Sequence, residues 1–291
     1  MKEFRYALSI EPGSALFNIF GGAIYRRLGD YEKAEKSMLL AYELDPRSTF
    51  MLMNLKGTVA SNRKYKQSLS IGDKSMNKDQ LSSAWNGRAY YFMTGDANTA
   101  IQMINKDDFI KMELSLYIND FMAAKNYLNN IKTELIQNNN VFMPKNYYLG
   151  IIEQGLGQKE LGIKYLTNAL DQLKKYIIKY PTDPRPFSSL GFVYARLGNK
   201  DEAIKAGLKA TELLPVSKDA MFGTYHRIFL TQIYALVNDK EKALEGIEYL
   251  STIPAGLHYG ELKSDHIWDS LREESRFKYV ISKLAENPDI E

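Results

Sequence analysis

The chain of 291 residues contains no cysteine. This absence excludes disulfide bonds, thiolate metal sites and a cysteine nucleophile. The chain also lacks any apolar run near the roughly 18 residues that a membrane span requires, and its first residues lack the apolar core of a secretion signal. We therefore expect a soluble, cytoplasmic chain with no membrane span.

Neither sign of charge dominates the sequence. The net charge is +3, and the basic residues are spread among acidic ones without forming a run. A clustered basic surface, on which nucleic-acid binding depends, is therefore not indicated. At 45% hydrophobic and 25% charged residues, the composition is that of a folded protein.

Histidine is scarce, and none of the three histidines has metal-ligand spacing to another. His258 and His266 are eight residues apart across a predicted loop, which matches no common zinc pattern. We expect these two and His226 at surface or capping positions. The acidic pairs at residues 107–108 and 273–274 fall at expected helix starts or on exposed faces, where carboxylates favour the helix dipole. The sequence predicts no metal site, no cofactor, no catalytic residues and no enzymatic activity.

The sequence does contain a recurring pattern of small and aromatic residues. One copy consists of Gly22, Tyr25, Gly29, Tyr31 and Ala34, followed by Ala41 and Pro46, and another of Gly191, Tyr194, Gly198 and Ala203, followed by Ala210 and Pro215. This order resembles the tetratricopeptide repeat (TPR), a helix-turn-helix unit of about 34 residues.

The resemblance implies an all-α fold, a right-handed superhelical solenoid of about six to seven helix pairs with a C-terminal capping helix. Antiparallel helices approach closely where small residues face each other, and the turn between them needs a residue that tolerates positive φ. We see no strand pattern. The inter-helix turns are expected near Gly29, Arg63, Gly95, Asn119, Gly157, Gly198 and Asn238.

The repeats suggest four segments. Residues 1–14 are a partial repeat with only its second helix, residues 15–180 hold repeats that are irregular in the middle, residues 181–256 hold further repeats, and residues 257–291 form a C-terminal cap. A long helix is expected over residues 161–180, because its apolar residues recur at helical spacing. Three prolines between Pro181 and Pro186 then end it.

Both ends of the sequence suggest that the chain belongs to a longer protein. Residues 4–12 match the second helix of a repeat whose first helix is missing, from which we expect the chain to be the C-terminal part of a longer protein. The end of the chain resembles the closing segment of TPR regions in bacterial multidomain signalling proteins. That resemblance implies an upstream kinase, nucleotide cyclase or winged-helix domain. Trp268, Leu271, Phe277 and Ile281 would cover the last repeat.

A stacked array of repeats lines its concave face with residues of the first helices. The candidate groove residues are Ile19, Arg26, Met53, Trp85, Phe92, Tyr147, Phe192, Arg196 and Tyr225. Each aromatic among them has core packing as an alternative, because a register error of one residue exchanges the two faces. Trp85 shows the choice: Ala84 occupies the usual tryptophan position of the repeat, so that Trp85 would point into the groove.

The predicted function is a non-catalytic scaffold that binds a peptide, helix or domain of another protein on this face. A chaperone-tail clamp is not expected, because only Asn54 matches the residues that such clamps use. The setting would be a larger bacterial signalling or transcription-regulatory protein. Two alternatives remain: a self-contained TPR adaptor or assembly factor, and the C-terminal part of an enzyme, a kinase or cyclase, whose active site lies upstream.

Overall fold

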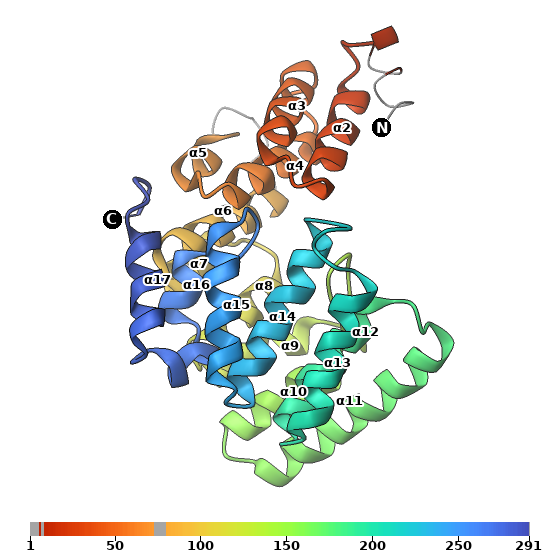
Figure 1. The fold of residues 1–291 in the computed structure, drawn as a ribbon, viewed down its shortest axis with the longest axis vertical. Helices are drawn as coiled ribbons and strands as arrows, with labels where there is room; N and C mark the ends of the chain where they lie inside the picture. The colour runs from red at the N-terminus through yellow and green to blue at the C-terminus, as the bar shows by residue number, and fades with distance from the viewer. Residues whose placement is uncertain (1–5, 7–8, 73–79, 291) are drawn as a thin grey trace.

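A computed structural model describes residues 6, 9–72 and 80–290. These residues form seven consecutive antiparallel helix pairs, followed by a shorter C-terminal segment (Figure 1). The pairs are α2 (Ala15–Arg27) with α3 (Tyr31–Leu44), α4 (Thr49–Ser61) with α5 (Tyr65–Ser70), α6 (Gln80–Thr94) with α7 (Ala97–Met103), α8 (Asp108–Tyr117) with α9 (Phe121–Asn130), α10 (Lys145–Gly155) with α11 (Lys159–Lys179), α12 (Pro184–Arg196) with α13 (Lys200–Leu213), and α14 (Phe222–Leu236) with α15 (Lys240–Thr252). The all-α fold of stacked helix pairs is therefore confirmed.

The turn inside each pair lies where the sequence predicts it. All seven predicted turn residues have positive φ, from 56° at Asn238 to 85° at Gly157. Glycine and asparagine tolerate this region most readily, and Arg63 at 58° is the exception. Residues 4, 5, 7 and 8 of the predicted half-repeat at residues 4–12 lie outside the described residues.

Small residues let the two helices of a pair approach each other closely. A methyl group added at Gly191 would lie 2.5 Å from the Cδ1 atom of Ile233 and 3.1 Å from the carbonyl oxygen of Ala203. Gly22 has the same position in its pair, where an added methyl would lie 3.1 Å from the carbonyl oxygen of Ala34. The recurring glycine of the sequence pattern is thus a contact point between helices.

The long helix predicted over residues 161–180 is α11, which ends at Lys179. After the prolines, α12 begins at Pro184, and the Asp183 carboxylate accepts a hydrogen bond from the Arg185 amide. Proline is tolerated at the first helical positions because its missing N–H has no partner there in any case. α11 packs against α12, so the stack of pairs continues across the break.

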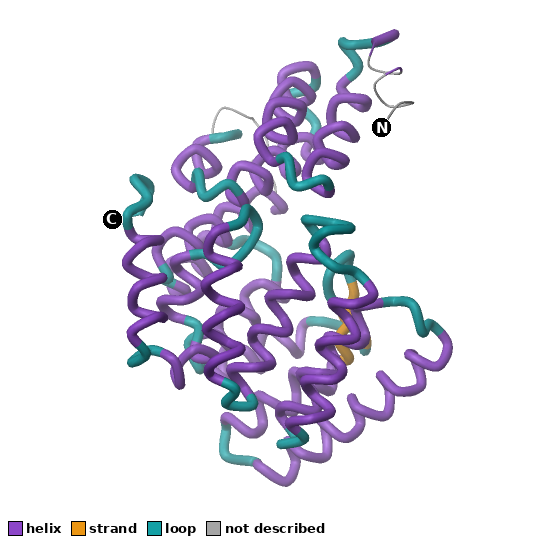
Figure 2. The backbone as a smooth tube through the Cα atoms, viewed as in Figure 1, coloured by secondary structure: helices purple, strands orange, loops and turns teal. Residues whose placement is uncertain are grey.

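The expectation of no strand is wrong at one place. β1 (Leu135–Gln137) and β2 (Phe142–Pro144) form an antiparallel hairpin, drawn in orange in Figure 2. Its side chains Ile136, Phe142 and Met143 are buried in the same cluster as residues of α10, α11 and α12. Each strand spans only three residues, which is too short for alternation to stand out in the sequence.

The C-terminal segment consists of α16 (Tyr259–Ser264), the 3₁₀ helix η1 (His266–Leu271) and α17 (Ser275–Ala285). Trp268, Leu271 and Phe277 share a buried cluster with Ile247 and Leu250 of α15, and Ile281 packs at its edge. The predicted cap residues therefore do cover the last helix pair.

The same segment also contacts the N-terminal repeats, so the superhelix closes on itself. Arg63 donates hydrogen bonds to the carbonyl oxygens of Leu250 and Leu257 at 3.2 and 3.1 Å. The Ala255 amide donates to Ser61 at 3.0 Å, and α16 packs against α6 (Figure 1). These contacts join residues almost two hundred positions apart. Among the described residues, no helix combines the length and apolar character needed to cross a membrane.

Candidate functional site

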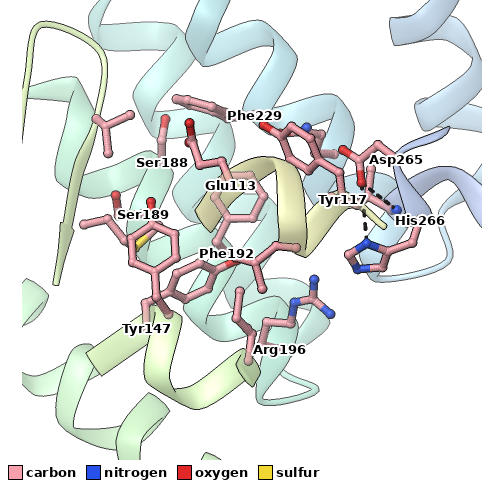
Figure 3. A pocket seen from close by; sticks show the side chains of 17 residues that line it. Glu113, Tyr117, Tyr147, Ser188, Ser189, Phe192, Arg196, Phe229, Asp265 and His266 are labelled. Atoms are coloured by element: carbon pink, nitrogen blue, oxygen red, sulfur yellow. Dashed lines mark hydrogen bonds and ion pairs between the residues drawn. The ribbon is translucent and has the colours of Figure 1, made fainter. Parts of the chain in front are cut away.

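The first helices of successive pairs face an interior that closure has turned into two adjoining cavities. The larger, of about 330 Å³, lies among α4, α6, α8, α14 and the start of the C-terminal segment. The smaller, of about 140 Å³, lies among α8, α10, α12, α14 and η1 (Figure 3). Five side chains line both cavities: Glu113, Tyr117, Val141, Phe229 and Gln232.

Seven of the nine candidate groove residues line these cavities. The larger cavity is bordered by Met53 of α4, Trp85 and Phe92 of α6, and Tyr225 of α14. The smaller is bordered by Tyr147, Phe192 and Arg196, which Figure 3 shows converging from α10 and α12. Contact of these residues with a ligand stays a prediction.

The other two candidates line neither cavity. For Ile19 the predicted groove position is wrong. Ile19 is only 1% exposed and belongs to a core cluster with Met38 and Leu55, so it packs between helices and is not available to a ligand. Arg26 donates a hydrogen bond to the Asn54 side-chain oxygen at 2.9 Å. It lies between α2 and α4, and neither cavity includes it.

The register at α6 places Trp85 on the cavity wall. Ala84 is buried at 4% exposure, whereas Trp85 is half-buried and its ring lies over Gly57 of α4. A methyl group added at Gly57 would lie 3.0 Å from the Trp85 ring. Glycine at this position therefore leaves space for the six-membered ring of the indole beside α4.

An ion pair between neighbouring first helices lines the larger cavity. The Arg88 guanidinium of α6 lies 2.7 Å from the Glu113 carboxylate of α8. Burial raises the pKa of Glu113, and Arg88 beside it opposes that rise. The sequence does not single out this pair, because the irregular repeat spacing between residues 63 and 157 hides which positions face inward.

Two further carboxyl groups reach the cavities from the C-terminal segment. Glu261 borders the larger cavity and Asp265 the smaller. Burial raises the pKa of each to about 7 because removal from water disfavours the charged form. No sequence signal marks these two residues as part of the site, because only the fold-back of the segment brings them to it.

The positions of the three histidines agree only in part with the expected surface or capping positions. His258 is the N-cap residue of α16, and its ring stacks on Phe92 with centroids 4.1 Å apart. His226 contradicts the prediction, since it is 1% exposed in the middle of α14. His266 is half-buried on the wall of the smaller cavity. Packing of first helices around the interior, and not capping, decides the position of His226.

One hydroxyl and imidazole lie in the arrangement that nucleophilic catalysis uses. The Ser188 oxygen is 2.9 Å from the Nδ1 atom of His226, and Ser188 lines the smaller cavity (Figure 3). Burial lowers the pKa of His226 to about 4, which makes it a weak base at neutral pH. In the described part of the chain, no carboxylate hydrogen-bonds to this imidazole. The pair is therefore a buried polar contact between α12 and α14.

The acidic pairs lie at helix starts, as expected. The Asp107 carboxylate accepts a hydrogen bond from the Ile110 amide at the start of α8, and Glu274 is the N-cap residue of α17. Throughout residues 6, 9–72 and 80–290, no group of three histidine, aspartate or glutamate side chains could hold a metal ion.

Two segments of the chain match the family model of the tetratricopeptide repeat, residues 22–48 and 186–215. They cover the end of α2 with all of α3, and nearly all of α12 with all of α13, where the clearest copies of the sequence pattern lie. In these two segments the chain is therefore similar to the tetratricopeptide repeat. A comparison with curated proteins gives no match.

Solved structures of the same kind are similar at low identity. A tetratricopeptide repeat protein from Parabacteroides merdae is 14% identical, with 94% of this chain and 99% of that chain covered and a TM-score of 0.45. A thermophilic TPR protein from Thermus thermophilus is also 14% identical, with 93% and 98% covered and a TM-score of 0.28.

Proposed function

We propose that this tetratricopeptide repeat protein is a non-catalytic scaffold that binds a peptide, helix or domain of another protein at its inner face. TPR units generally serve protein–protein interaction, and the inner face is where first-helix side chains converge. The observation that carries the proposal is the larger cavity, on which Met53, Trp85 and Tyr225 meet from three different helices.

The chemistry of this wall suits recognition of a protein segment. Binding energy at protein interfaces concentrates in a few aromatic and arginine side chains that lie in desolvated pockets. Trp85, Phe92, Tyr225 and Phe229 supply such rings, and the Arg88–Glu113 pair supplies fixed polar groups among them. Ligand sites are typically apolar cavities with a small number of placed polar groups.

The proposal that the scaffold is non-catalytic is supported by the state of the polar groups. The arrangement closest to catalytic geometry is the contact of Ser188 with His226, and an imidazole with a pKa of about 4 is poorly matched to proton transfer at neutral pH. A hydrolase assay with small ester substrates tests this directly. Turnover that disappears in Ser188→Ala would contradict the proposal.

The setting remains the one that the sequence predicts: a region of a larger bacterial signalling or transcription-regulatory protein. The alternatives are a self-contained adaptor and the C-terminal part of a kinase or cyclase. An immunoblot of source cells with an antibody against this chain distinguishes the adaptor from the two larger proteins by size. A band well above 33.3 kDa supports a larger protein, and a band at that mass supports the adaptor.

The binding function is tested by capture of partners from source cells with matched variants. Trp85→Ala removes a ring from the inner wall, whereas Tyr249→Ala removes an exposed ring of α15. We expect a partner that the unaltered chain and Tyr249→Ala retain and that Trp85→Ala loses by about tenfold or more. Equal retention by all three proteins would contradict binding at the inner face.

A further inference from the structure

We propose that the larger cavity is a binding site for an organic cation, a guanidinium or ammonium group that lies between the Glu261 carboxylate and the aromatic walls. The cation would be a lysine or arginine side chain of the bound segment, an assignment that rests on the proposed function. The cation site itself rests only on the cavity and its walls.

The first argument is the balance of charge on the cavity wall. Its lining residues include three carboxylates, Asp107, Glu113 and Glu261, and a single arginine, Arg88. The Arg88 guanidinium already forms an ion pair with the Glu113 carboxylate at 2.7 Å. Asp107 caps α8 by accepting a hydrogen bond from the Ile110 amide. Among the described residues, Glu261 forms no ion pair, and the nearby charges of Arg88 and Arg63 only partly offset the rise that burial causes in its pKa.

The second argument is the position of Glu261. Its Oε2 atom accepts a hydrogen bond from the His258 amide at 2.9 Å. Among the described residues, no cation forms an ion pair with it. The side chain is half-buried and lines the cavity. A buried charge is stable when a partner of opposite charge is present, and the cavity offers the place for one.

The third argument is the aromatic character of the rest of the wall. Trp85 and Phe92 of α6 and Tyr225 and Phe229 of α14 border the same space as Glu261. The faces of such rings attract cations, and the attraction strengthens when water is excluded. The neighbouring His258 does not repel a cation, because burial lowers its pKa well below the ordinary value and keeps it neutral.

The titration of Glu261 links binding to pH. Burial raises its pKa to about 7, so the carboxyl group carries its charge only above that pH. The charged and titratable groups that interact with it are Arg63, Tyr65, Arg88, Tyr91, Glu113, Tyr117, Tyr225, His258 and Asp265. A bound cation favours the ionised form, and binding therefore strengthens as pH rises through about 7.

The test uses four probes: N-acetyl-arginine amide, N-acetyl-lysine amide, the neutral isostere N-acetyl-citrulline amide, and free agmatine. Affinities are measured by calorimetry for the unaltered chain, for Glu261→Gln and for Glu32→Gln, an exposed glutamate of α3. Glutamine in place of Glu261 can still accept the His258 amide, and thermal unfolding checks that each variant is folded. We expect at least about tenfold weaker binding of the citrulline probe, and a similar loss of arginine-probe affinity in Glu261→Gln alone.

Two outcomes would overturn the cation site: equal affinity for the arginine and citrulline probes, or an unchanged arginine affinity in Glu261→Gln. Agmatine binding alone, without the acetylated amides, would support the cation site and place its source in a free small molecule. A protein partner that Trp85→Ala loses but Glu261→Gln retains would leave the proposed function intact and contradict this inference. Between about pH 6 and pH 8 the arginine affinity should rise in the unaltered chain and stay flat in Glu261→Gln.

Discussion

The two tryptophans of the chain lie in different surroundings. Trp268 is 0% exposed inside the cluster of α15 and the C-terminal segment, whereas Trp85 borders the larger cavity. Removal of a ring from a packed core loses its contacts and leaves a cavity, while removal from an existing cavity wall enlarges space that is already there.

We expect Trp268→Ala to lower the free energy of unfolding by about 3–5 kcal/mol and Trp85→Ala by roughly 1–2 kcal/mol. Urea denaturation followed by far-ultraviolet circular dichroism measures both without depending on tryptophan fluorescence. If the two losses are equal, Trp85 is a core residue and its assignment to the cavity wall is wrong.

Asp265 makes stability depend on pH. It is 4% exposed, and burial raises its pKa from 3.8 to about 7. Between about pH 4 and pH 7 the unfolded state releases this proton before the folded state does, so stability falls as pH rises through that window. The charge that appears in the folded state at higher pH is the one that burial disfavours.

Asp265→Asn keeps an acceptor for the Ile267 amide and removes the titration. We expect the variant to be more stable than the unaltered chain by roughly 1–3 kcal/mol at pH 8, with little difference at pH 4. Denaturation curves at the two values of pH give the comparison. An advantage that does not change with pH would show that Asp265 is not the group responsible.

At the scale of elements, the turns and helix ends could be predicted from sequence and the β-hairpin could not. A turn such as that at Gly198 depends on one residue with positive φ and on the small residues beside it, which are local properties. The hairpin forms because α10, α11 and α12 cover its buried side chains. Its Asn138 carbonyl oxygen also accepts a hydrogen bond from Arg185 at 2.8 Å, a partner distant in the sequence.

Phe142 is the residue through which the hairpin joins the core. It is 2% exposed, and its ring lies against Tyr176 of α11 with centroids 3.9 Å apart. We expect Phe142→Ala to lower the free energy of unfolding by about 3–5 kcal/mol and to speed hydrogen exchange in both strands. The control is Ile163→Ala on the exposed face of α11, with an expected change of at most about 0.5 kcal/mol. Unchanged exchange in the strands would mean that the hairpin forms independently of the core.

At the scale of the whole molecule, closure depends on a close approach between α6 and α16. A methyl group added at Gly260 would lie 1.7 Å from the Tyr91 carbonyl oxygen and 2.6 Å from the Gly95 amide nitrogen. Both are backbone atoms, which cannot rotate away as a flexible side chain can. A side chain at this position therefore requires the two helices to separate.

We expect Gly260→Ala to increase the radius of gyration in small-angle X-ray scattering and to cost about 1–3 kcal/mol of stability. Gly13→Ala is the control, because an added methyl there meets no atom within 4 Å. A variant at Gly260 with unchanged size and stability would contradict the closed superhelix. If the cation site exists, the same variant should bind the arginine probe more weakly, since Glu261 and Trp85 lie on opposite sides of this contact.

As with the fold, some residues of the candidate site could be predicted from the sequence and others could not. Trp85, Tyr225 and the other first-helix aromatics could be named from sequence, because the helical period and the turn positions indicate which side of each first helix faces inward. Ile19 was misassigned because the same period also describes the side that packs against the second helix. No sequence pattern marked Glu261 and Asp265 as site residues, since they belong to a segment outside the repeats.

The sequence by itself determined the helix pairs, their turns and the residue types of the inner face. Each of these follows from residues within one or two turns of helix, where conformational preference and the spacing of apolar residues act directly. The tertiary structure alone decided that the array closes, that the inner face becomes two cavities, and that acidic side chains of the C-terminal segment complete their walls. Those features depend on the small rotation between successive pairs, which accumulates along the array and which no local pattern specifies.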